Sequence, residues 1–174
     1  PPGEVVSIRL GNSDTGAQAE SITYNYTVDS GAKQILILKY AVVLEDPNHG
    51  ASEQPKFTLE LLDENGRQLD RCGVANFIAS ASLPGWHREQ NNYDVVMWKD
   101  WTTTGLNLTP YAANGAKNIK IRLTTYDCSQ SGHFGYAYFS LNCADAKISG
   151  ISCGAVATAS VSAPIGFNYE WTKA

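Results

Sequence analysis

The sequence predicts an all-β fold of the β-sandwich class, and three observations lead to this prediction. Helical periodicity is missing along all 174 residues. Runs with the alternation of half-buried strands recur instead, separated by turn residues about every 8–12 positions. Charged residues make up only 17% of the chain, and the β-branched, aromatic and small polar residues in their place suit a pleated, half-buried surface. A sandwich accommodates many such short strands.

The first part of the chain predicts three strands and a loop. Val5–Leu10 is a short strand. Ser21–Val28 alternates between apolar and small polar residues, as a strand with one buried face does. Gln34–Leu44 is a longer apolar run, so we expect a central strand that is buried on both faces. The polar residues of Glu45–Pro55 then predict a loop.

A hairpin and several further strands are expected in the middle of the chain. Asn-Gly at 65–66, between the runs Phe57–Asp63 and Arg67–Cys72, predicts a tight hairpin turn. Residues 73–92 show no alternation and are expected to be irregular. The remaining elements predicted in this part are four strands and one helical turn: Tyr93–Trp101, Gly105–Leu108, Ile119–Tyr126, Phe134–Leu141 and Thr109–Ala113.

The character of the sequence changes after Cys143. Three brief strand-like runs follow, at Lys147–Ile151, Ala155–Val161 and Phe167–Trp171. They predict the opening strands of a second sandwich. We therefore expect one sandwich module over residues 4–143 and a linker with the start of a second domain over residues 144–174.

Composition and motifs exclude several classes of function. The net charge of −4, without a basic block, argues against nucleic acid as a partner. No apolar run approaches the ~18 residues of a membrane-spanning helix, so no membrane insertion is expected. The motifs G-x-S-x-G and H-E-x-x-H and a glycine-rich phosphate loop are missing. We predict that the protein is not an enzyme.

The four cysteines, Cys72, Cys128, Cys143 and Cys153, contain no C-x-x-C pair, so they lack the usual spacing of a four-thiolate zinc site. An even count in a strand-rich chain with a polar surface favours disulfides and an oxidising compartment. Of the three possible pairings we favour Cys72–Cys128 with Cys143–Cys153, because the second pair would close a short local loop. The alternative is four free, buried thiols in a cytosolic protein.

Two loops, 45–49 and 127–133, each follow an apolar strand and hold a carboxylate beside a histidine. Strand ends gather at the two poles of a sandwich, so these loops can meet. Oxygen atoms of Asp46, Asn48 and Asp127, joined by Glu20, would then offer the ligands that calcium prefers. We therefore predict a calcium ion between the loops.

Two alternatives to this calcium site stay open. In the first, Asp46 and Asn48 only shape a turn through side-chain hydrogen bonds to the backbone. In the second, zinc is bound, which would require His49 and His133 to converge as nitrogen ligands.

Aromatic residues supply the candidate ligand-binding side chains, because the C–H faces of sugar rings pack on aromatic rings. Six aromatic residues could supply such a platform: Trp86, Tyr93, Trp98, Trp101, Tyr136 and Tyr138. From these we select Trp86, Tyr93 and Trp101, and Trp86 is expected to be the best exposed because it lies in an irregular polar segment. Trp98 and Trp101 are three residues apart in one strand, so alternation predicts that they point to opposite faces. The alternative is that these aromatic residues fill the core.

Six short segments resemble a module of large secreted surface proteins of Bacteroidota, of the gliding-motility-associated adhesin type: Val6–Asn12, Gly16–Glu20, Tyr40–His49, Trp98–Thr102, Tyr126–Cys128 and Gly132–Tyr138. The resemblance covers roughly residues 4–143. The tail around Cys153 and Ala163–Phe167 resembles the first strands of the immunoglobulin-like repeats that follow such modules. The layout is more loosely similar to jelly-roll domains of the MAM and galactose-binding type.

The resemblance implies a jelly-roll β-sandwich followed by a partial immunoglobulin-like segment, in a secreted, multidomain cell-surface protein exported by the type IX route. It implies no particular ligand and no metal ligands. We expect an extracellular adhesion or carbohydrate-binding module, stabilised by calcium, whose partners are a glycan or cell-surface protein and neighbouring domains. The alternatives are a structural spacer or assembly module that binds no small ligand, and the accessory domain of a hydrolase.

Overall fold

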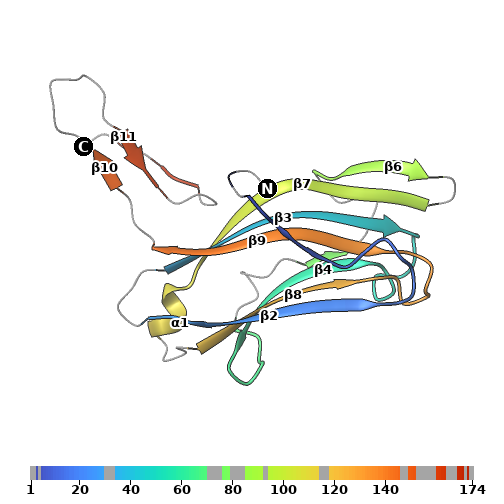
Figure 1. Cartoon of the computed structure of the whole chain (residues 1–174), viewed down its shortest axis with the longest axis horizontal. Coiled ribbons are helices and arrows are strands. Elements are labelled where there is room, and N and C mark those ends of the chain that lie inside the picture. The colour runs from blue at the N-terminus through green and yellow to red at the C-terminus, as the bar shows by residue number, and fades with distance from the viewer. Residues whose placement is uncertain are drawn as a thin grey trace.

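The predicted all-β sandwich is confirmed. The computed structural model describes residues 3, 5–29, 34–69, 76–78, 85–91, 94–113, 118–145, 149–151, 160–163, 168–170 and 172. Over these residues the chain forms two stacked antiparallel sheets, which Figure 1 shows one above the other.

The two sheets contain nine strands in total over the described residues, and the chain crosses repeatedly between the sheets, as in a jelly roll. The five-stranded sheet has the order β1-β9-β3-β7-β6, with bounds Ile8–Leu10, Gly135–Asp145, Gln34–Asp46, Asp94–Asn107 and His87–Asn91. The four-stranded sheet has the order β2-β8-β4-β5, with bounds Ala19–Thr27, Asn118–Tyr126, Lys56–Asp63 and Asn76–Ile78. The helix α1 (Thr109–Ala113) links β7 to β8 where one helical turn was expected.

The core lies between the sheets and is built from alternate residues of each strand. β3 is the central strand that its apolar run predicts, and its residues Leu36, Leu38 and Tyr40 are buried. They belong to the same apolar cluster as Phe57 and Leu59 of β4. Burial of each such side chain contributes about 1.5–3 kcal/mol, so this cluster is the main source of stability.

The irregular segment expected at 73–92 contains two strands, so that prediction is wrong in part. β5 pairs with the start of β4, and β6 pairs with the start of β7. Both are short strands at sheet edges, and the sequence of β6 is entirely polar, His-Arg-Glu-Gln-Asn. A strand without an apolar face leaves no alternation to detect.

The two strands expected at Tyr93–Trp101 and Gly105–Leu108 are one continuous strand, β7, with an irregularity in its middle. On the two sides of this irregularity, Val42 of β3 pairs with Lys99 and Tyr40 pairs with Thr102. Two residues of β7 therefore lie opposite the single residue Ala41, which is a β-bulge.

The bulge overturns the expectation that Trp98 and Trp101 face opposite sides. Thr102 pairs with the core residue Tyr40, so the preceding residue Trp101 points to the outer face. Trp98 pairs with Val43, which lies between the buried residues Val42 and Leu44 and therefore also points outward. The inserted residue thus places both tryptophans on the outer side of the five-stranded sheet.

The tail forms a separate two-stranded sheet of β10 (Ser149–Ile151) and β11 (Ser160–Ser162). β9 ends at Asp145, close to the boundary expected after residue 143. The start of a second domain stays a prediction. Of the strand expected at Phe167–Trp171, residues 168–170 are not in a strand, and the other two lie outside the described residues. The described helix is too short to cross a bilayer.

Candidate functional site: a histidine–cysteine cluster and an aromatic row

The loops after β3 and β8 meet at one end of the sandwich, as the sequence predicts. The backbone N–H of Ser129 donates a hydrogen bond to the carbonyl of Glu53 (3.1 Å). The Gln130 side chain donates to the Glu53 carboxylate (2.9 Å). Beside them, the N–H of Glu45 donates to the carbonyl of Phe134 (3.0 Å). These bonds hold the two loops together.

The Asp46 carboxylate shapes the turn that follows it. One oxygen, Oδ1, accepts hydrogen bonds from the N–H of Asn48 (2.8 Å) and from the side-chain amide of Gln54 (2.6 Å). Asn48 has a left-handed backbone, with φ of 59°, a conformation that asparagine tolerates better than most residues. Asp46 and Asn48 therefore have the turn-shaping role that was the alternative to calcium binding.

Asp127 and Glu20 also accept hydrogen bonds from neighbouring loops. Asp127 accepts from the N–H groups of Gln18 and Gly135 (both 3.1 Å). Glu20 accepts from the N–H of Gly11 (2.9 Å). The pKa of Asp127 is raised overall, mainly by burial and also by the charge of Glu20. The two backbone donors act in the opposite direction and lower this pKa. Both carboxylates stabilise the positions of loops.

The three carboxylates proposed for calcium thus accept hydrogen bonds that shape or position the loops. Asp46, Asp127 and Glu20 do not form a cluster of potential metal ligands among the residues that the structure describes. Gly135 helps to explain why the loops are so close, because a Cβ there would lie 2.7 Å from the Tyr126 carbonyl oxygen.

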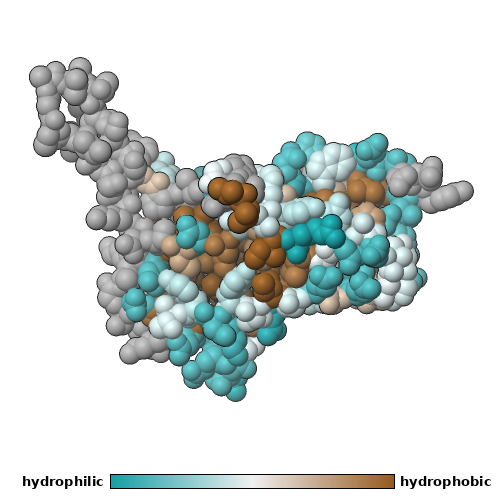
Figure 2. Space-filling view, viewed as in Figure 1, coloured by the Kyte–Doolittle hydropathy of each residue, from teal (hydrophilic) through white to brown (hydrophobic). Residues whose placement is uncertain are grey.

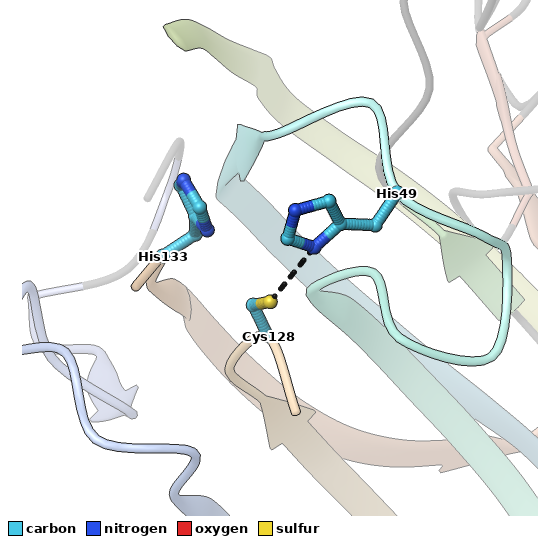
Figure 3. Close-up of side chains that lie close together, drawn as sticks. All are labelled: His49, Cys128 and His133. Carbon is cyan, nitrogen blue, oxygen red and sulfur yellow. Dashed lines mark hydrogen bonds between the residues drawn. The ribbon is translucent and has the colours of Figure 1, made fainter. Parts of the chain in front are cut away.

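His49, Cys128 and His133 form a cluster instead. One ligand atom from each residue lies within 4.8 Å of the other two. Figure 3 shows the three side chains pointing toward one shared space from the loops after β3 and β8. His49 Nδ1 is 3.2 Å from Cys128 Sγ, and the two imidazole rings meet edge to face with centroids 5.4 Å apart. The convergence of histidines that the zinc alternative required is therefore found.

Cys128 is a free thiol, fully buried beside His49. Its sulfur also accepts a hydrogen bond from the N–H of Gln130 (3.3 Å). Cys143 is free as well, and burial raises the pKa of its thiol. The structure therefore does not support the favoured disulfide pairings. Their other members, Cys72 and Cys153, lie outside the described residues.

His133 is held by one ring nitrogen and unsatisfied at the other. Its Nε2 lies 3.3 Å from Oδ1 of Asp94, at the start of β7. Its Nδ1 is buried and has no hydrogen-bond partner among the described residues. Glu45 lies close by, and the pKa of its carboxyl is raised overall, mainly by burial. The charge of Asp94 also raises this pKa, whereas the N–H of Phe134 and the charge of His133 lower it.

A second candidate site lies on the outer face of the five-stranded sheet. Val43 of β3 pairs with Trp98 on one side and with Tyr136 on the other, so these three side chains form a line across the strands. The line is extended by further ring contacts, at centroid distances of 5.3–6.0 Å: His87 on Trp98, Phe134 on Tyr136, and Tyr138 on Tyr136. We call the following five side chains the aromatic row: His87, Trp98, Phe134, Tyr136 and Tyr138.

Polar groups lie along the aromatic row. The guanidinium of Arg9 lies 5.9 Å from the centroid of the Tyr136 ring. His87 Nε2 is 2.7 Å from Oδ2 of Asp100, and both side chains are more than half exposed. The row therefore combines partly exposed ring faces with hydrogen-bonding groups.

The three aromatic residues singled out from the sequence have different outcomes. Trp86 is partly buried and packs against the core, so it is not the exposed ring that its position indicated. Trp101 is partly buried on the outer side of β7. Tyr93 lies outside the described residues.

A groove lies between residues of the two sheets. Figure 2 shows apolar surface gathered near the middle of the molecule. The volume of the groove is about 440 Å³, and its lining includes Val6, Ile8, Tyr24, Tyr26 and Leu141. Val5 and Val6 beside it are 99% and 76% exposed. This part of the surface suits contact with another apolar surface.

No protein-family model matches the chain, and no curated protein matches it.

Proposed function

We propose that this chain is a non-catalytic, extracellular adhesion or carbohydrate-binding module of a larger cell-surface protein, and that it binds a glycan on the outer face of the five-stranded sheet. The observation that carries the proposal is the aromatic row. The resemblance of six segments to modules of secreted surface proteins supports the extracellular setting.

The row has the physical properties that sugar binding needs. Neighbouring strands are about 4.8 Å apart, so Trp98, Val43 and Tyr136 present a surface several strands wide at a similar level. Aromatic rings bury a large area against the C–H faces of a sugar. Arg9 and Asp100, both exposed beside the row, supply a donor and an acceptor for sugar hydroxyls.

Calcium is left out of this proposal. Asp46, Asp127 and Glu20 already accept hydrogen bonds that position the loops, and the row needs no ion to present its rings.

A glycan array followed by titration calorimetry with the best-bound sugar tests the proposal. Tyr136→Ala and Trp98→Ala should each weaken binding by several-fold or more while thermal melting stays close to that of the parent protein. Tyr169→Ala is the matched control, because Tyr169 is 39% exposed and is not part of the row. An array that stays blank with folded protein, or equal losses for Tyr169→Ala, would contradict glycan binding by the row.

The second candidate function is a spacer or assembly module that contacts neighbouring domains of its parent chain. The groove and the exposed valines at positions 5 and 6 favour it. Hydrogen exchange on a longer piece of the parent protein separates the two functions. Protection of β1 and of residues 140–143 by the neighbouring domains, together with a blank glycan array, would favour the assembly module.

A further inference from the structure

We propose that His49, Cys128 and His133 bind one transition-metal ion, with Zn²⁺ as the ion that the donor set favours. This inference is independent of glycan binding, because none of these three side chains belongs to the aromatic row. It differs from the calcium expectation in both the ligands and the chemistry of the ion.

The distances suit a small ion with nitrogen and sulfur ligands. Zinc is bound at about 2.0–2.1 Å by histidine nitrogen and about 2.3 Å by cysteine sulfur, which separates tetrahedral ligand atoms by about 3.3–3.6 Å. His49 Nδ1 and Cys128 Sγ are 3.2 Å apart, and the full set lies within 4.8 Å. Small side-chain rotations therefore bring all three atoms to bonding distance.

The donor chemistry selects the class of ion. A thiolate and two imidazoles are ligands for zinc and copper, whereas calcium and magnesium prefer oxygen. Buried free cysteines also occur as ordinary small core residues. Cys128 differs from such a residue because its sulfur faces an imidazole nitrogen on one side and the N–H of Gln130 on another. Its sulfur therefore lies among polar groups at the point where the two loops meet.

The unsatisfied nitrogen of His133 is the second, independent observation. Buried polar atoms in folded proteins are nearly always hydrogen-bonded, so one without a partner needs an explanation. Nδ1 of His133 is such an atom among the described residues, and a metal ion bound there would satisfy it.

Asp94 prepares His133 for this role. Its Oδ1 lies 3.3 Å from Nε2 of His133, so the proton of a neutral imidazole is held on Nε2 and the lone pair remains on Nδ1. A carboxylate that fixes the tautomer of a ligating histidine in this way is a common partner of metal sites. Asp94 is therefore a positioning residue and not a ligand.

The three ligands leave one position of a tetrahedral zinc ion open, for water or for a group from a binding partner. On binding, the thiol proton of Cys128 passes to solvent, and His49 keeps its proton on Nε2 so that Nδ1 can ligate. The ion would join the loop after β3 to the loop after β8, which the Glu53 hydrogen bonds already hold in register.

Cobalt substitution tests the ligands directly. The full chain, reduced and treated with chelator, is titrated with Co²⁺, and zinc is then used to displace it. We expect one equivalent of cobalt, a thiolate-to-cobalt charge-transfer band, and loss of that band on addition of zinc. Cys128→Ser should abolish the band, and His133→Asn and His49→Asn should strongly weaken binding. Asp94→Asn should weaken it by about 10–100-fold.

Matched controls come from the same chain. His87→Asn and Cys143→Ser should leave the cobalt band and the zinc affinity unchanged, because His87 pairs with Asp100 and Cys143 lies on β9 away from the cluster. No cobalt band in the unaltered protein, or zinc binding that survives Cys128→Ser, would overturn the proposal. Copper binding without zinc binding would overturn the assignment of zinc.

A measurement on the unaltered protein covers the case in which the variants do not fold. Alkylation of thiols followed by peptide mass spectrometry reports each cysteine separately. Zinc should slow the modification of Cys128 and leave that of Cys143 unchanged. Equal rates for Cys128 with and without zinc would count against the site.

Discussion

The histidine–cysteine cluster and the aromatic row adjoin one another but are built differently. The cluster is drawn from two loops and depends on three side chains around a buried space. The row comes from β6, β7, β9 and the residue before β9, crosses β3, and is partly exposed along its length. They meet at neighbouring residues, because His133 belongs to the cluster and Phe134, the next residue, stacks on Tyr136 of the row. A site with three ligands is lost with any one of them, whereas a surface of several rings weakens step by step.

The largest effect is expected from a core substitution that unfolds the sandwich, because zinc binding and glycan binding both require the folded sheets. Phe139 is fully buried on the inner face of β9, the strand that carries Tyr136 and Tyr138 on its outer face. Phe139→Ala should destabilise the fold by about 3–5 kcal/mol, measured by urea unfolding. Zinc binding and glycan binding should be lost in the same transition. Loss of one at much lower urea than the other would show that the two regions unfold separately.

Zinc should stabilise the fold through the cluster alone. At a hundredfold excess over its Kd, an ion that binds only the folded state contributes about 2.7 kcal/mol, which raises the Tm by about 5–11 °C for a chain of this size. The rise should vanish in Cys128→Ser and persist in Tyr136→Ala. A rise of equal size in Cys128→Ser would place the ion elsewhere.

Removing one ring of the row should have a smaller effect, confined to binding. Tyr136→Ala should weaken glycan binding by at least about 1 kcal/mol, because the ring lies at the centre of the row. Its stacked neighbours remain, so some binding should persist at high sugar concentration. Calorimetry measures the glycan affinity of this variant with and without saturating zinc, and a separate titration measures its zinc affinity. Zinc affinity that falls with glycan affinity in this variant would mean that the regions are not independent.

The smallest expected effect is a change with pH at Glu45, which lies between the two regions. Burial raises the pKa of Glu45 in the folded protein, so the fold favours the protonated carboxyl. The stabilisation from this protonated form is fully present below the ordinary carboxyl range and is lost as the pH rises through the raised pKa. Glu45→Gln removes this dependence. The stability of the unaltered protein relative to Glu45→Gln should therefore fall as the pH rises above the ordinary carboxyl range of about 4. Urea midpoints measure it, and a constant or rising difference would contradict the raised pKa.

The strands could be predicted where one face is apolar. β2 and β3 follow from alternation and from a long apolar run, and the meeting of the two loops follows from strand ends gathering at one pole. β6 could not be predicted because all its side chains are polar. The face of Trp101 could not be predicted because one bulge reverses the alternation, and the sequence carries no signal for the position of a bulge.

The candidate sites were predictable only in part, for a related reason. The two loops were found from their carboxylates, but hydrogen bonds to nearby N–H groups engage those carboxylates, and the histidines and Cys128 face the shared space. Cys128 was missed as a partner of the histidines because an even cysteine count favoured disulfides. Its place five residues before His133, in the same loop, was the signal that could have found it. Asp94 is distant in sequence, and only the register of β7 reveals it.

X-ray absorption at the zinc edge tests the central claim most directly. The protein with one equivalent of zinc should show one sulfur at about 2.3 Å and nitrogen or oxygen atoms at about 2.0–2.1 Å in the first shell. The sulfur should be missing in Cys128→Ser and present in Cys143→Ser. A shell of oxygen and nitrogen alone in the unaltered protein would contradict a metal site made by His49, Cys128 and His133.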